Sequence, residues 1–233
     1  MGVWVGTVKT SRWTKGRALL AGGLVLGVGA AATLAAWTDN EWVFGGSGNG
    51  DGTGPNTPGT GVYRMQQNTW TGTSGAANWT DEKDPNGGAL TFTVDPGKLI
   101  PGKTVYSPMQ LRAVAGSETL DVSLAEGIQS ALNPGTSNSP DLYAALTYGV
   151  YKGVDKATCE AGTVGGGSVV VPAGSPLTAV SATTFPLAAG ANASTPGAPE
   201  SLCFALTLPS SASADLQGLN TVPVWRFTSS VGQ

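Results

Sequence analysis

Short runs of alternating apolar and polar residues fill the chain from Val62 to its end, and Gly, Pro and Asn interrupt them. β-Branched and aromatic residues at every second position are typical of strands with one buried face, and no long stretch has the period of an amphipathic helix. The clearest runs are 62–67, 89–94, 104–114, 118–124, 168–173, 183–187, 201–209 and 222–230. This pattern predicts an all-β fold, an antiparallel β-sandwich of about eight or nine strands over residues 62–233.

Composition supports a turn-rich β protein, since only 12% of the 233 residues are charged and the chain contains 35 Gly and 15 Pro. Pro108 lies inside the run 104–114 and predicts an edge position or a bulge there. Short helical turns are expected after Ser139 and within 213–220. The run 139–153 is then expected to continue as a strand.

The first 36 residues have the order of a secretory signal peptide, with an n-region over 1–17 and an h-region over 18–36. Four basic residues precede nineteen uncharged ones, of which eleven are Ala or Gly. The uncharged stretch is longer than the usual h-region of about 7–15 residues, so a retained membrane anchor is the alternative. Its weak hydrophobicity favours a cleaved signal. The arginines are not adjacent, which argues against a twin-arginine leader.

A short strand and a long tether are expected between the leader and the sandwich. "WTDNEWVF" (37–44) places Trp37, Trp42 and Phe44 among polar residues in an imperfect alternation. The next seventeen residues, 45–61, are rich in Gly and carry no large apolar side chain. Such a linker has an r.m.s. reach of roughly 20 Å, so the first strand need not pack where it is attached.

The leader resembles the signals of the TasA/camelysin family, whose members are secreted proteins. The resemblance lies in "GLVLGVGAAATLAAWTDNE" (23–41) and, more weakly, in "TFTVDPGKLIPGKTVYSPMQLRAVAGSETLDVSL" (91–124) and "DLQGLNTVPVWRFTSS" (215–230). The family's segment with an "lxPGd" turn has an acidic residue where this chain has Lys103. The resemblance implies a jelly-roll-like sandwich, cleavage between Ala36 and Trp37 by a SipW-type signal peptidase, and a protein secreted to the cell surface. Its membrane contact would be only through the uncleaved leader.

Charge excludes one class of partner. Removing the first 36 residues leaves eight basic and fifteen acidic residues, a net charge of −7. Nucleic-acid binding needs clustered Lys and Arg, so we expect no such partner.

Catalytic motifs are not recognisable, and the chain contains no His. The sequence therefore lacks Ser-His-Asp, Cys-His and HExxH arrangements. The acidic word "DEKD" (81–84) is most simply a solvated loop, and "NGDGTG" (49–54) offers one carboxylate where calcium normally collects several. We expect no enzyme activity, no metal and no cofactor, although camelysin-like members are described as metallo-endopeptidases and that activity stays the alternative.

Two cysteines, Cys159 and Cys203, are the only ones in the chain. An exported chain meets an oxidising environment, so one disulfide between them is the expected pairing, with a reactive thiol as the minority alternative.

Tryptophans outside the leader offer a second alternative function. Trp70 and Trp79 lie in a polar loop and could present aromatic faces to a glycan, as in a monomeric surface adhesin, although packing against the sandwich is the simpler interpretation. Trp225 is expected in the core or a sheet.

The leading hypothesis is an exported structural protein of the cell surface or biofilm matrix that forms fibres. An N-terminal strand on a flexible tether can join the sheet of a neighbouring copy, which makes a head-to-tail contact that propagates. Trp37, Trp42 and Phe44 are the candidate subunit contacts. TasA-like proteins form matrix fibres, so the resemblance implies the same self-association into a homopolymer.

Overall fold

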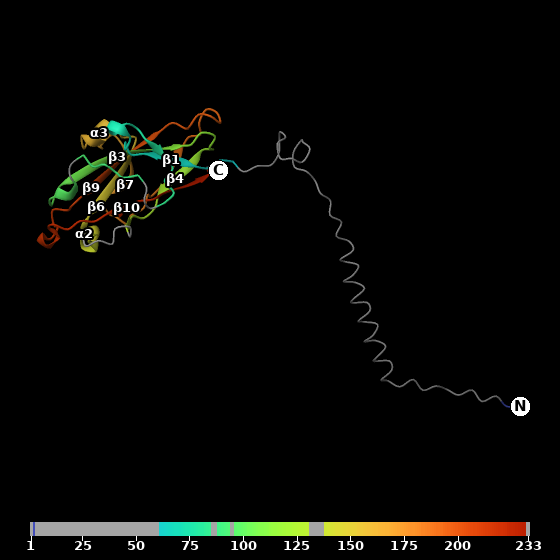
Figure 1. Ribbon diagram of the computed structural model, residues 1–233. Coiled ribbons are helices and arrows are strands. Elements are labelled where there is room, and N and C mark those ends of the chain that lie inside the picture. Colours follow the sequence, from blue (N-terminus) through green and yellow to red (C-terminus); the bar gives the residue numbers. More distant parts are fainter. Residues whose placement is uncertain (1, 3–60, 85–87, 94–95, 131–137, 232–233) are drawn as a thin grey trace. The chain divides into compact units, whose positions relative to one another are not determined.

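A computed structural model describes residues 2, 61–84, 88–93, 96–130 and 138–231 (Figure 1). The expected signal cleavage site at Ala36 and Trp37, the candidate donor strand 37–44 and all of the linker except Gly61 lie outside the described residues. Thr60–Gln233 forms one compact unit.

Eleven strands in the described part of the chain form three sheets, and every pairing between these strands is antiparallel. The six-stranded sheet has the order β2-β1-β3-β9-β6-β7, the three-stranded sheet the order β11-β4-β8, and β10 pairs with β5. The strands are β1 Met65–Asn68, β2 Trp79–Thr80, β3 Thr104–Ala113, β4 Leu120–Leu124, β5 Ile128–Gln129, β6 Thr147–Lys152, β7 Ser168–Pro176, β8 Phe185–Leu187, β9 Glu200–Thr207, β10 Pro223–Val224 and β11 Phe227–Val231. The all-β prediction is confirmed at this level: antiparallel sheets in a sandwich-like arrangement with a few short helices.

The helices are short, and two of them lie on opposite sides of the unit: α2 Pro140–Ala145 and α3 Lys156–Glu160 (Figure 1). Single 3-10 turns occur at η1 Thr73–Gly75, η2 Pro96–Lys98 and η3 Ala214–Leu216. The helical turns expected after Ser139 and within 213–220 are confirmed as α2 and η3, and the Ser139 side chain caps α2 by accepting from the Leu142 N–H. Helix α3 was not predicted.

The core lies between the six-stranded and three-stranded sheets. Strand β3 alternates as the sequence predicts, since its odd-numbered residues from Val105 to Ala113 are buried. The other buried apolar side chains come from strands β4, β6, β7, β8 and β9 and the residues next to them. These strands together make one continuous core.

Pro108 lies in β3, an interior strand of the six-stranded sheet, but at a point where only one side of that strand is paired. It pairs with Cys203 of β9, whereas β1 has already ended at Asn68, opposite Gln110. On the side of β3 away from β9, the Tyr106 carbonyl accepts a hydrogen bond from the Thr93 N–H. The backbone groups of residues two apart in a strand point to the same side, so those of Pro108 also point away from β9. The Pro108 nitrogen therefore faces a side without a ladder, and its lack of an N–H costs no strand hydrogen bond.

Two predicted strands differ from the structure. The described residues 88–93 of the run 89–94 form no strand, although this segment is tied to β3 by the Thr93 bond and by the Ser107 hydroxyl, which donates to the Thr91 carbonyl at 3.0 Å. The run 222–230 is divided into β10 and β11, because Trp225 and Arg226 interrupt the ladder. The other runs match strands within a few residues.

Candidate functional site: an open groove beside strand β11

An open groove with a volume of about 1300 Å³ reaches into the core. Most of its lining is apolar and comes from four parts of the chain. These are the core-facing side chains Met65, Met109, Leu111, Phe204, Leu206 and Leu208; the segment with Leu90, Phe92, Leu99 and Ile100; the α2 residues Leu142 and Leu146; and the stretch from Ser213 to Phe227.

The groove exposes side chains that belong to the core. Met65, Leu90 and Phe92 pack against the core cluster but are only partly buried, and so are Leu216 and Phe227. Protein interiors are normally close-packed, so partly exposed core side chains mark an incompletely covered part of the core. The described residues therefore leave part of the core open at this groove.

Strand β11 borders the groove at Phe227 and is an edge strand of its sheet. Phe227 and Val231 pair with Leu124 and Leu120, which are buried in the core, so these side chains share the core-facing side. Val231 is nevertheless 42% exposed. The core-facing side of β11 is thus partly buried at Phe227 and lacks cover at Val231.

An aromatic cluster forms one end of the groove. The ring centroid of Trp225 lies 5.5 Å from that of Tyr148 and 5.2 Å from that of Phe204, and Phe227 meets Phe204 edge-on at 6.3 Å. These contacts join the six-stranded sheet to the stretch between β10 and β11.

Two buried polar atoms near this cluster have no hydrogen-bond partner among the described residues: the Trp225 Nε1 and the Tyr143 hydroxyl. The Tyr148 hydroxyl, in contrast, donates to the Ala179 carbonyl at 2.6 Å. Burial, with a smaller contribution from Tyr143, raises the pKa of Tyr148 to about 12. Burial, followed by the charge of Glu126, raises the pKa of Tyr143. Both phenols are neutral at ordinary pH.

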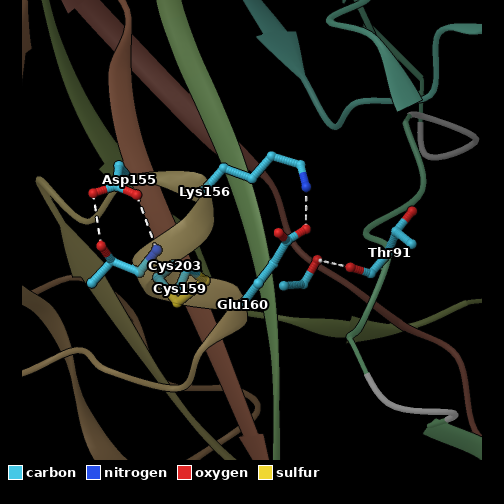
Figure 2. Close-up of a disulfide and its surroundings, with 8 residues drawn as sticks. Thr91, Asp155, Lys156, Cys159, Glu160 and Cys203 are labelled. Carbon is cyan, nitrogen blue, oxygen red and sulfur yellow. Dashed lines mark hydrogen bonds and ion pairs between the residues drawn. A yellow bond between two sulfur atoms is a disulfide. The ribbon is translucent and has the colours of Figure 1, made fainter. Parts of the chain in front are cut away.

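The predicted disulfide between Cys159 and Cys203 is confirmed (Figure 2). It ties α3 to β9 on the outer face of the six-stranded sheet, and both cysteines are fully buried. Val154, Tyr106, Tyr151 and Val164 pack around it as a second, smaller core. Since both cysteines are bonded to each other, the alternative of a reactive thiol is wrong.

Helix α3 is held over the disulfide by local hydrogen bonds (Figure 2). The Asp155 carboxylate accepts from the Thr158 N–H at 3.0 Å and from the Thr158 hydroxyl at 2.7 Å. The Thr158 hydrogen bonds hold the pKa of Asp155 below its usual range. Lys156 forms an ion pair with Glu160 one turn later. The Asp155 cap and the Lys156–Glu160 ion pair both stabilise this five-residue helix.

The two loop tryptophans lie on opposite ends of a loop that the buried Asn68 organises. The Asn68 side-chain oxygen accepts from the Trp70 N–H at 2.9 Å and from the Asn78 N–H at 3.0 Å. Trp79 carries the Arg112 guanidinium 4.0 Å from its ring centroid, and Trp70 has the Lys156 ammonium at 5.8 Å. One face of Trp79 is therefore already covered by a cation, which leaves less of it for a sugar.

The described residues contain no group of three or more His, Cys, Asp and Glu that could hold a metal ion. No helix within them has the length and apolar character needed to cross a bilayer. In the acidic segment 81–84, the Asp81 carboxylate oxygen Oδ2 lies 3.6 Å from the Arg64 guanidinium and 3.8 Å from the Lys83 ammonium. The word "NGDGTG" and the candidate contacts Trp37, Trp42 and Phe44 lie outside the described residues.

The groove itself was not predicted from the sequence. Its lining comes from distant segments that share no motif, and Leu90 and Phe92 belong to a run whose alternation predicts a strand. The one available signal was the excess of apolar residues in non-strand stretches such as "KLIPG" and "DLQGL". No protein-family model and no curated protein matches this chain.

Proposed function

We propose that this chain is an exported structural protein of the cell surface or biofilm matrix that assembles into fibres by exchange of its N-terminal strand. The groove beside β11 supports the proposal, because it is a largely apolar gap of about 1300 Å³ that the described residues of the sandwich leave open. The proposed occupant is the segment 37–44 of a neighbouring copy. Cleavage at Ala36 by a SipW-type signal peptidase would release this segment, and the sandwich would be of the jelly-roll class.

The segment suits such a groove in length and in pattern. Eight extended residues span about 26 Å, the length of a strand such as β9, which also has eight residues. Trp42 and Phe44 are two residues apart, so they share one face of a strand and are the pair that would enter the apolar groove. Asp39 and Glu41 would lie on the face with Trp37.

The free energies of burial and of ordering indicate which interactions would hold such a strand in the groove. Burying two aromatic side chains of about 150–250 Å² each stabilises the complex by about 8–12 kcal/mol. Ordering the backbone of eight residues costs about 8–16 kcal/mol. Side-chain burial alone is therefore marginal, and backbone hydrogen bonds to the acceptor sheet are needed as well.

The contact would be head-to-tail. One copy donates residues 37–44 and keeps its own groove open for the next copy, so the same contact repeats without closing. The tether 45–61, with a reach of roughly 20 Å, would allow the donor segment to leave its own domain.

Deletion tests this function. The exported chain is expected to form fibres visible by electron microscopy, and the chain without residues 37–44 is expected to stay a folded monomer by size-exclusion chromatography. A double change, Trp42→Ser with Phe44→Ser, is expected to have the same effect, whereas Thr38→Ser is the control that keeps assembly. Fibres from the deleted chain, or an apolar small molecule retained in the groove by native mass spectrometry of a permanently monomeric wild type, would overturn the proposal.

A further inference from the structure

Four strands form the edges of the two larger sheets in the described part of the chain: β2, β7, β8 and β11. An edge strand presents free N–H and C=O groups, and proteins commonly shorten such strands or place Pro, charges or bulges in them to prevent pairing with other chains. The four edges differ in these features.

Three of the edges are protected. Strand β2 is two residues long. Strand β7 contains the exposed Pro172 and Pro176, and its pairing with β6 has register shifts around Val150. Strand β8 has three residues with Pro186 in the middle. None of these three edges offers a regular ladder to an incoming strand.

Strand β11 is different, since Phe227–Val231 contains no Pro, no Gly and no charged residue, and its register with β4 is regular over five pairs. The Arg226 carbonyl accepts from the Ala125 N–H, so the backbone groups of even-numbered residues point towards β4. Those of Phe227, Ser229 and Val231 therefore point away from β4, each with one donor and one acceptor. The same three side chains are the core-facing ones.

From these observations we infer that β11 is the acceptor edge: an extended segment of a second copy pairs with the backbone of Phe227, Ser229 and Val231 and extends the three-stranded sheet, with one end of the segment at the groove beside Phe227. The inference rests on the proposed function and goes beyond it by naming the edge that receives the strand. The incoming strand would add a fourth strand to this sheet, beside the groove that Phe227 lines.

Ser229→Pro tests the pairing. This change removes an N–H that points away from β4, so the ladder within the domain keeps its hydrogen bonds, while the incoming strand loses one and meets the pyrrolidine ring. Ser229→Ala is the matched control, because it alters the same side chain and keeps the N–H. We expect the rate of fibre growth, followed by light scattering and electron microscopy, to fall at least tenfold in Ser229→Pro and to stay within twofold of wild type in Ser229→Ala.

A second pair of variants keeps the inference testable if Ser229→Pro does not fold, which its thermal melting curve would show. Val231→Lys places a charge on the core-facing side of the edge, and Ser230→Lys places the same charge on the outer side. Assembly is expected to stop in Val231→Lys alone. Normal fibres from folded Ser229→Pro and Val231→Lys would overturn the assignment of β11 and leave the proposed function intact. Absence of fibres from the wild-type exported chain would overturn the proposed function itself.

Discussion

The rings of Phe204 and Trp225 lie 5.2 Å apart at an interplanar angle of 52° and connect the two layers of the fold. Phe204 belongs to β9 of the six-stranded sheet, and Trp225 joins β10 to β11. Both line the groove, so the same contact that holds the layers together forms one end of the candidate site. The stability of the domain and the shape of the groove are thereby linked.

Phe204→Ala is expected to destabilise the domain by about 3–5 kcal/mol, because Phe204 is 1% exposed and its removal leaves a cavity beneath Trp225. Urea unfolding followed by tryptophan fluorescence measures this change. Val169→Ala, at a side chain that is 57% exposed, is the control and is expected to change the free energy of unfolding by less than about 0.5 kcal/mol. Equal effects of the two substitutions would contradict the described core.

Replacing both cysteines with alanine is expected to lower the free energy of unfolding by about 4 kcal/mol, because the bond closes a loop with a sequence separation of 44. A reductant should lower the melting temperature of the wild type and leave that of the double variant unchanged. Two thiols that titrate freely in the folded exported protein would disprove the pairing.

Tyr143 and Tyr148 form a matched test of hydroxyl pairing. Tyr148→Phe leaves the Ala179 carbonyl without its donor and is expected to destabilise the domain by about 1–3 kcal/mol. Tyr143→Phe removes a buried hydroxyl without a partner among the described residues and is expected to be neutral or slightly stabilising. Equilibrium unfolding of the two variants should therefore differ in sign or clearly in size, and a larger loss in Tyr143→Phe would show that its hydroxyl is paired.

The lowered pKa of Asp155 predicts that the stability of the folded domain falls at acid pH. Its pKa in the folded protein is lowered from 3.8, mainly by the hydrogen bonds from Thr158, so the carboxylate stabilises α3 above that value and the contribution is lost as pH falls through the lower folded pKa. Thermal melting between pH 2 and pH 7 should show this loss in the wild type. Asp155→Asn can still accept a cap hydrogen bond but does not titrate, so its curve should lack this step. Parallel curves for the two proteins would contradict the cap.

Local pattern was sufficient for the strands that pack in the usual way. The runs 104–114, 118–124 and 201–209 correspond to β3, β4 and β9. Apolar and polar residues alternate in them because one face of each strand is buried in the core and the other is not. The disulfide was equally predictable, since Cys159 and Cys203 have no other cysteine to pair with. The signal peptide and the donor segment stay predictions.

Other features depended on tertiary contacts. Pro108 is tolerated in an interior strand because β1 ends two residues short of it, and the length of a neighbouring strand cannot be read from the local pattern around Pro108. The run 89–94 has strand-like alternation, but its described residues have no regular ladder partner. Helix α3 forms where Asp155 caps it and the disulfide fastens it to β9.

The amino-acid pattern is therefore enough to predict a chain rich in strands, the places of most of these strands and the disulfide, because alternation and turn residues act locally and only two cysteines are present. Which strands lie at the edges of the sheets, and where the core is left open, depends on contacts between distant segments. Those properties arise from how Met65, Phe92, Phe204 and Phe227, which are far apart in the chain, come together around one groove. The regular, uncharged edge of β11 is suited to pairing with another strand because it borders an apolar surface that the described part of the chain does not cover.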